Sequence, residues 1–395
     1  MNELDALYAF LVAAAVAGLL TPLVARFATR IGAVDHPRER GLSARETPLL
    51  GGLAILAGVL AAGALFLPGD DQTRAILAAA ALIAAVGAID DAIDLPPVVK
   101  LLGQIGAALI VVLSDVKVTV ITLPFLGHID FGSTWGGILT VIGLVGVMNI
   151  VNFSDGIDGL AAGVCTISAV AFAIIAFDLQ REAAGVLAAL TAGAALGFLF
   201  WNFHPASVFM GDSGSNLLGL LLGCIAVQGT LKTNALIALV GPLVILAVPF
   251  LDGGFVVAKR LKYRRRPWTA DAEHFHHRLS RIGFSQRRTV LYLYGWTFAL
   301  AGLAVALRFI PYSDHHGHLH VGWTIVVVVL SLLAVAASVY LVYVLELLKF
   351  TRRRGVAAAE RALETGEFDA VRVDDPISAP DGRTARPTRS VRGPR

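Results

Sequence analysis

Long runs of apolar residues alternate with short polar segments along most of this chain. About eleven of these runs approach the roughly 20 residues that a helix needs to cross the hydrocarbon core of a bilayer. We therefore predict an all-α polytopic membrane protein with about eleven transmembrane helices. The predicted helices lie at 5–28, 49–67, 75–89, 98–114, 134–151, 159–177, 183–201, 214–230, 235–257, 289–309 and 321–348.

The basic residues are distributed unevenly between the two sides of this arrangement. With the N-terminus outside, the inner segments hold 27 of the 32 Lys and Arg residues, and the outer segments hold 5. Loops rich in Lys and Arg stay on the cytosolic side of a membrane. The sequence therefore predicts an external N-terminus and a cytosolic C-terminus.

The composition changes abruptly after Phe350. The remaining residues are rich in Arg, Pro, Asp, Glu and Gly and lack apolar periodicity, as disordered segments do. We interpret 1–350 as a transmembrane domain whose cytosolic loops carry the active site. We interpret 351–395 as a basic, disordered cytosolic tail that contacts anionic lipid headgroups.

The overall composition excludes several other classes of protein. Hydrophobic residues make up 56% of the 395 residues and charged residues only 15%, more apolar surface than a soluble chain buries. The net charge of +3 argues against a nucleic-acid partner, and two cysteines within apolar runs argue against a disulfide scaffold. Many Gly and Ala residues in the spans would permit close packing of two copies in a homodimer.

Five polar clusters fall in segments that the predicted topology places on the inner face. A carboxylate near the end of an apolar helix is costly unless a cation accompanies it. Oxygen donors without cysteine suit Mg²⁺ or Mn²⁺ rather than zinc, and protein-bound Mg²⁺ commonly keeps substrate phosphates among its ligands. The sequence thus predicts a phosphate-bearing substrate. The clusters contain Asp35 to Arg40, Asp90 to Asp94, Asn149 to Asp158, Asp212 to Ser215, and His274 to His277.

Each cluster also has a purely structural interpretation. Asp90 and Asp91 could cap a helix, Asp155 and Asp158 could form a glycine-permitted turn, and Asp212 could start a helix. Their coincidence on one face favours a shared site. The histidines beside the ten Lys and Arg residues of 259–288 favour polyanion binding, whereas the outer histidines between 315 and 320 are interpreted as solvated.

In order and spacing, these clusters resemble the polyprenyl-phosphate N-acetylhexosamine-1-phosphate transferases. The histidine motif is similar to the branch that uses UDP-N-acetylglucosamine rather than the UDP-muramoyl pentapeptide. In the first cytosolic loop, Gly41 and Ser43 stand where that family usually has Lys and His, and Arg45 is the candidate replacement. The motifs are Gly87-Ala-Ile-Asp90-Asp91 with Pro96, Pro97 and Lys100; Asn152-Phe-Ser-Asp155-Gly-Ile-Asp158-Gly; Phe209-Met-Gly-Asp212-Ser-Gly-Ser; and His274-Phe-His276-His277-Arg278-Leu279.

The resemblance implies an enzyme of the plasma membrane with its site on the cytoplasmic face. It would transfer N-acetylhexosamine 1-phosphate, with N-acetylglucosamine as the expected sugar, from a UDP-sugar to undecaprenyl or decaprenyl phosphate. The products would be UMP and a polyprenyl-diphosphate-sugar that initiates a cell-envelope glycan. One alternative is a phospho-N-acetylmuramoyl-pentapeptide transferase. Another is a secondary transporter, although the apolar spans are nearly free of the midplane charges that transporters use.

The resemblance also implies roles for the site residues. Asp90 and Asp91 are the catalytic candidates beside the metal, as positioning groups or as a proton acceptor, with a covalent aspartyl-phosphate route as the alternative. Asp212 and Asn152 are the candidate ligands of Mg²⁺, with Mn²⁺ as the alternative ion. The lipid phosphate needs little help from a base, because the second pKa of a phosphate monoester is about 6. The candidate substrate-binding residues are Asn152, Asp155, Asp158, Lys100, Arg45, His274, His276 and His277.

Overall fold

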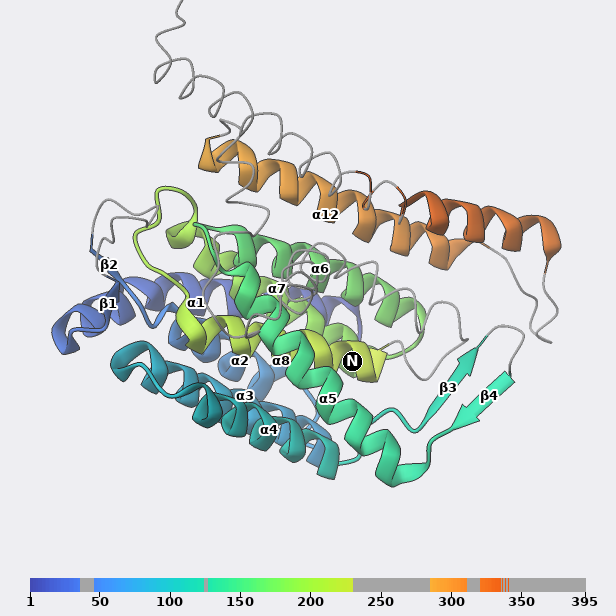
Figure 1. Cartoon of the computed structure of the whole chain (residues 1–395), viewed down its shortest axis with the longest axis horizontal. Helices are drawn as coiled ribbons and strands as arrows, with labels where there is room; N and C mark the ends of the chain where they lie inside the picture. Colours follow the sequence, from blue (N-terminus) through green and yellow to red (C-terminus); the bar gives the residue numbers. More distant parts are fainter. Residues whose placement is uncertain are drawn as a thin grey trace, which may run out of the picture. The chain divides into compact units, whose positions relative to one another are not determined.

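The computed structural model describes residues 1–35, 46–123, 127–229, 285–310 and 320–334, together with 336, 338 and 340. All of them belong to Met1–Glu346, the first of two units into which the chain divides. This part of the chain is mostly helical (Figure 1). Its helices are α1 (Glu3–Ile31), α2 (Gly51–Phe66), α3 (Asp71–Ile93), α4 (Pro97–Leu113), α5 (Gly132–Ser154), α6 (Leu160–Asp178), α7 (Glu182–Asn202), α8 (Gly211–Gly229), α12 (Gln286–Phe309) and an apolar helix at Val321–Ala334.

Each predicted apolar run that the structure describes forms a helix, with ends that differ from the predicted ends by a few residues. By length and composition, α1, α3, α5, α6, α7 and α12 are able to cross a membrane, and α2, α4 and Val321–Ala334 are shorter apolar helices. The chain is therefore a multi-pass membrane protein. The predicted helix at 235–257 and the predicted tail at 351–395 lie outside the described residues.

Two short antiparallel pairs complete the described secondary structure. Strand β1 (Val34–Asp35) pairs with β2 (Thr47–Pro48), and β3 (Val120–Leu123) pairs with β4 (Gly127–Asp130). The β3–β4 hairpin lies between α4 and α5 (Figure 1), where the hydrophobic pattern predicts no element.

Small residues let the helices approach closely. Along α1, Ala9 and Ala13 are fully buried, whereas Leu19 is 75% exposed. The buried face packs against α7, where a Cβ on Gly193 would lie 2.1 Å from the Phe10 carbonyl oxygen. The apolar face that remains exposed is the one expected to contact lipid, because helix association in a membrane favours small residues at the interface.

Helix α8 is the element that positions the site. Nearly all of its residues are buried, and it packs against α3, α5 and α2. The chain just before it is bonded to the start of α2. The Gly51 N–H donates to the Phe209 carbonyl oxygen and the Gly52 N–H donates to that of Met210, both at 3.0 Å.

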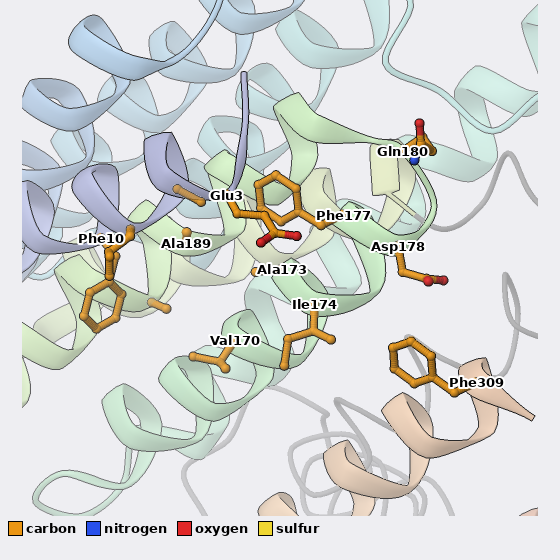
Figure 2. A pocket seen from close by; sticks show the side chains of 13 residues that line it. Glu3, Phe10, Val170, Ala173, Ile174, Phe177, Asp178, Gln180, Ala189 and Phe309 are labelled. Atoms are coloured by element: carbon orange, nitrogen blue, oxygen red, sulfur yellow. The ribbon is translucent and has the colours of Figure 1, made fainter.

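A cavity of about 640 Å³ lies between the first turns of α1 and the last turns of α6 and α12 (Figure 2). Apolar side chains line most of it, including Phe10, Phe177 and Phe309, together with the carboxylates of Glu3 and Asp178. None of the described candidate site residues lines this cavity.

Candidate active site

Asp90 and Asp91 lie in the last turn of α3, which corrects the prediction that they follow the helix. The apolar run stops at Ile89, but the helix continues to Ile93. Asp94 then adopts a left-handed conformation with φ of 55°, which Asp tolerates better than most residues, and its N–H donates to the Asp90 carbonyl oxygen at 2.8 Å. The Leu95 N–H donates to Asp90 Oδ1 at 2.7 Å. Asp90 therefore stabilises the reversal of the chain into α4.

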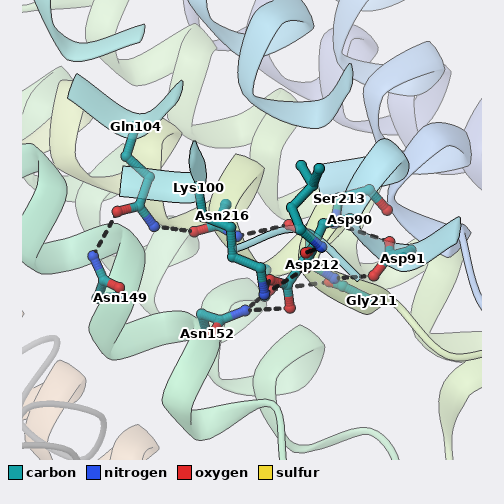
Figure 3. A network of polar contacts seen from close by, with 12 residues as sticks. Asp90, Asp91, Lys100, Gln104, Asn149, Asn152, Gly211, Asp212, Ser213 and Asn216 are labelled. Atoms are coloured by element: carbon teal, nitrogen blue, oxygen red, sulfur yellow. Dashed lines mark hydrogen bonds and ion pairs between the residues drawn. The ribbon is translucent and has the colours of Figure 1, made fainter. Parts of the chain in front are cut away.

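Lys100, near the start of α4, joins two of the carboxylates. Its Nζ lies 2.5 Å from Asp90 Oδ2 and 2.9 Å from Asp212 Oδ2 (Figure 3). The Asp90 side chain is 6% exposed, and that of Asp212 is 25% exposed. Carboxylates this buried require a nearby positive charge, which Lys100 supplies.

Asp91 holds the beginning of α8. Its Oδ1 accepts the Asp212 N–H at 2.7 Å, and its Oδ2 accepts the Ser213 N–H at 3.1 Å. These N–H groups have no partner inside their own helix. Gly211 precedes them with φ of 70°, and a Cβ there would lie 2.3 Å from Asp91 Oδ2. Asp91 therefore caps α8, and glycine at 211 makes room for its carboxylate.

Asn152 contacts the other side of Asp212 from the last turn of α5. Its Nδ2 donates to Asp212 Oδ1 and to Ser215 Oγ, both at 2.9 Å. Both carboxylate oxygens of Asp212 therefore have a partner, one on α5 and the other on α4. Two neighbouring helices thus fix the orientation of a carboxylate on a third helix.

The three carboxylates provide a donor set for a cation. Asp90, Asp91 and Asp212 each offer an oxygen, and these three oxygens lie within 4.8 Å of one another. Oxygen donors of this kind suit a hard divalent ion. The ammonium group of Lys100 already contacts two of the carboxylates, which shows that positive charge is stable at this position. The residues present therefore fit the predicted Mg²⁺ or Mn²⁺.

Asp155 directly follows α5 at the same end of the helices. Burial raises the pKa of its carboxyl group to about 8, and the negative charges of Asp212, Asp91 and Asp158 act in the same direction. Asp155 therefore lies within the field of these three carboxylates. The site holds more negative charge than Lys100 alone balances.

Asp158 is joined to a different segment. Its Oδ2 lies 2.7 Å from His204 Nδ1 and accepts the Ala206 N–H at 3.0 Å. Nearby, Asn202 accepts the Gly159 N–H and donates to the Val208 carbonyl oxygen, both at 3.0 Å. These bonds fix the α7–α8 loop, which leads to Asp212, against the start of α6.

Sequence reasoning missed His204. The available signal was its position in Asn202-Phe-His-Pro205, only a few residues before the Phe209-Met-Gly-Asp212 motif. The side chain is 32% exposed beside Asp158. It is therefore a candidate for substrate contact that a motif search for carboxylates does not find.

The basic block is the segment 259–288 with its ten Lys and Arg residues, and its described end contacts the same loop. Arg287 Nε donates to the His204 carbonyl oxygen at 3.2 Å, and the Tyr294 hydroxyl donates to the Gly159 carbonyl oxygen. The start of α12 therefore packs beside Asp158. The other candidates, Arg45, His274, His276 and His277, lie outside the described residues.

The described carboxylates of the site lie within a segment that matches a known protein family. Residues 73–230, which span α3 to α8, match the model of "Glycosyl transferase family 4". The chain is 37% identical over 304 residues to a probable undecaprenyl-phosphate N-acetylglucosaminyl 1-phosphate transferase of Bacillus subtilis, with 75% of this chain and 84% of the relative covered.

Two further relatives represent the two branches considered above, one relative for each branch. The chain is 38% identical over 336 residues to a decaprenyl-phosphate N-acetylglucosaminephosphotransferase of Mycolicibacterium smegmatis, with 75% and 83% covered. It is 34% identical over 286 residues to a phospho-N-acetylmuramoyl-pentapeptide-transferase of Desulforamulus reducens, with 67% and 83% covered. The similarity is higher to the N-acetylglucosamine branch.

Proposed function

Because the chain belongs to glycosyl transferase family 4, we propose that it transfers N-acetylglucosamine 1-phosphate from UDP-N-acetylglucosamine to a polyprenyl phosphate. The products are a polyprenyl-diphosphate-sugar and UMP, and the lipid product initiates a cell-envelope glycan. The observation that carries the proposal is the meeting of Asp90, Asp91, Asp212 and Lys100 at the ends of apolar helices. This position suits a reaction between a membrane lipid and a water-soluble nucleotide.

The reaction exchanges one phosphoanhydride for another. An oxygen of the lipid phosphate attacks the β-phosphorus of the UDP-sugar, and the bond from that phosphorus to the bridging oxygen breaks to release UMP. The attacking phosphate is largely dianionic at neutral pH, since its second pKa is about 6. The protein therefore needs to position two polyanions and to neutralise charge rather than to remove a proton.

The described residues divide this work. Asp212 would hold a divalent cation with the amide oxygen of Asn152, beside Asp90 and Asp91, and Mg²⁺ is the expected ion, with Mn²⁺ as the alternative. Such an ion supplies charge neutralisation at the diphosphate. Lys100 would exchange Asp212 for a substrate phosphate, because its ammonium group already lies between the carboxylates of Asp90 and Asp212. Asp91 keeps Asp212 in place by capping α8.

The nucleotide-sugar is proposed to bind on the Asp155 and Asp158 side. Arg287 contributes positive charge there, next to the His204 loop. The histidines of the basic block and Arg45 remain the predicted contacts for the diphosphate and sugar. The residues proposed for this role outside the described structure are Arg45, His274, His276 and His277.

The function is tested by measuring UMP release. Purified protein is incubated with polyprenyl phosphate, Mg²⁺ and one UDP-sugar at a time. We expect release with UDP-N-acetylglucosamine that requires the lipid and is lost when a chelator removes the metal. Release only with the UDP-muramoyl pentapeptide would instead support the other branch. No UMP from any donor would contradict the transferase function.

The proposed orientation places the N-terminus outside, about eleven helices in the plasma membrane and the site on the cytoplasmic face. A cysteine introduced at Asp70, between α2 and α3, should react with a membrane-impermeant maleimide in intact cells. A cysteine at Lys349 should react only after the cells are opened. Cys165 and Cys224 are buried and give little background. If only Lys349→Cys were labelled in intact cells, the orientation would be the opposite of the one proposed.

A further inference from the structure

Two side-chain contacts join α4 to α8, one helical turn apart. Lys100 Nζ lies 2.9 Å from Asp212 Oδ2, and Gln104 Nε2 donates to Asn216 Oδ1 at 2.8 Å. Residues four apart lie on the same face of a helix. The two contacts therefore form consecutive rungs between one face of α4 and one face of α8 (Figure 3).

The second rung continues in both directions. Asn149 Nδ2, on α5, donates to Gln104 Oε1 at 2.8 Å. Asn216 Nδ2 donates to the main-chain carbonyl oxygen of Asp212 at 2.9 Å. Gln104 and Asn216 are each only 5% exposed. A chain of three amides, two of them buried and that of Asn149 partly buried, therefore connects α5 and α4 to the first turn of α8.

The two rungs respond differently to ligands. In the proposed reaction, Asp212 binds a cation and Lys100 binds a substrate phosphate, so the ion pair between these two residues opens. The side-chain amides of Gln104 and Asn216 are neutral, so they bind a cation or a phosphate more weakly than Asp212 and Lys100 do. Their hydrogen bonds are also costly to break, because a buried polar group left without a partner has lost its contact with water and gained none in return. The amide rung should therefore persist when the ionic rung opens.

We propose that the amide chain Asn149–Gln104–Asn216 is a positioning element that holds α4 against α8 while Lys100 exchanges Asp212 for substrate. Gln104 and Asn216 act through Lys100 and Asp212, which they keep at the right separation. The exchange rests on the proposed function. The effect on cation binding at Asp212 is measurable without any substrate.

The first test replaces Gln104 with Met, which has a similar length and removes both hydrogen bonds. Gln228→Met is the matched control, because Gln228 donates to Gln72 at 3.3 Å between α8 and α3, at the other end of α8. Mn²⁺ binding to the full purified chain is measured by electron paramagnetic resonance, together with thermal unfolding and UMP release. We expect Gln104→Met to weaken Mn²⁺ binding and to lower kcat/KM, each by at least about tenfold. Gln228→Met should keep both values.

A second test keeps the combined length of the two side chains at 104 and 216 while exchanging their identities. Gln104→Asn shortens the side chain by one methylene, and Asn216→Gln lengthens its partner by one. The single Gln104→Asn change should weaken Mn²⁺ binding, and the exchanged pair should recover most of it. Recovery would show that Gln104 acts through its contact with Asn216, which gives a second measure of the role if Gln104→Met fails to fold.

Three results would overturn the positioning role: unchanged Mn²⁺ binding in Gln104→Met, equal losses in Gln228→Met, or no recovery in the exchanged pair. A native chain that binds Mn²⁺ but releases no UMP would instead contradict the proposed function. The Mn²⁺ comparison between variants would still decide the role of the amides.

Discussion

Replacing Asp212 with Asn should lower kcat for UMP release by about 10³-fold, since loss of one preorganised electrostatic group costs 10²–10³ in comparable sites. The change preserves the size of the side chain and an acceptor for Asn152. It removes the negative charge that pairs with Lys100 and that a hard cation requires. The measurement is the rate at saturating UDP-N-acetylglucosamine and polyprenyl phosphate, corrected for folded protein.

Asp178→Asn provides the control for this prediction. Asp178 is also ion-paired, at 2.6 Å from Arg308, and is 30% exposed. It is the last residue of α6, whereas Asp158 lies just before the first residue of that helix. We expect the control to keep native activity. If Asp212→Asn kept native activity and native Mg²⁺ dependence, Asp212 would not be the metal ligand.

The helices could be predicted because a bilayer leaves the backbone few alternatives. Every N–H and C=O group in the hydrocarbon core needs a partner within the protein, so an apolar run of sufficient length forms a helix. The runs at 159–177 and 183–201 accordingly become α6 and α7 with nearly the predicted ends. The hydrophobic pattern fails at the end of α3, because it cannot detect the partners that let Asp90 and Asp91 remain helical.

The types of residue in the site could be predicted, but their partners could not. Asp91 and Asp212 are 121 residues apart, and neither motif reveals that one carboxylate caps the other's helix. Gln104 and Asn216 are 112 residues apart, and a single amide in an apolar run is uninformative until the helices are packed. The carboxylates were visible in the sequence because charge at a membrane-spanning helix end is unusual.

The approach of α3 to α8 allows the carboxylates to meet, and it depends on Gly87. A Cβ at this position would lie 2.4 Å from the Ser213 nitrogen and 2.5 Å from the Asp212 carbonyl carbon. Both are backbone atoms of the first turn of α8, so they cannot rotate away. Any larger residue at 87 must push the two helices apart and move Asp91 away from the N–H groups that it caps.

We therefore expect Gly87→Ala to lower the melting temperature, at a cost of about 1–3 kcal/mol for overpacking. It should also lower kcat/KM by at least about 10²-fold, because a shift of about 1 Å in a catalytic group has an effect of that size. Thermal unfolding and UMP release are measured on the same preparation. A variant with native stability and native kinetics would contradict the close contact between α3 and α8.

Gly146→Ala, within α5, separates this contact from helix propensity. A Cβ on Gly146 meets no described atom within 4 Å. Ala is favoured over Gly inside a helix by up to about 1 kcal/mol, so this change should leave activity intact and keep or raise the melting temperature. The two variants add the same methyl group to an apolar helix. Opposite effects would therefore show that the backbone contact at Gly87, rather than the loss of a glycine, holds Asp90 and Asp91 against Asp212.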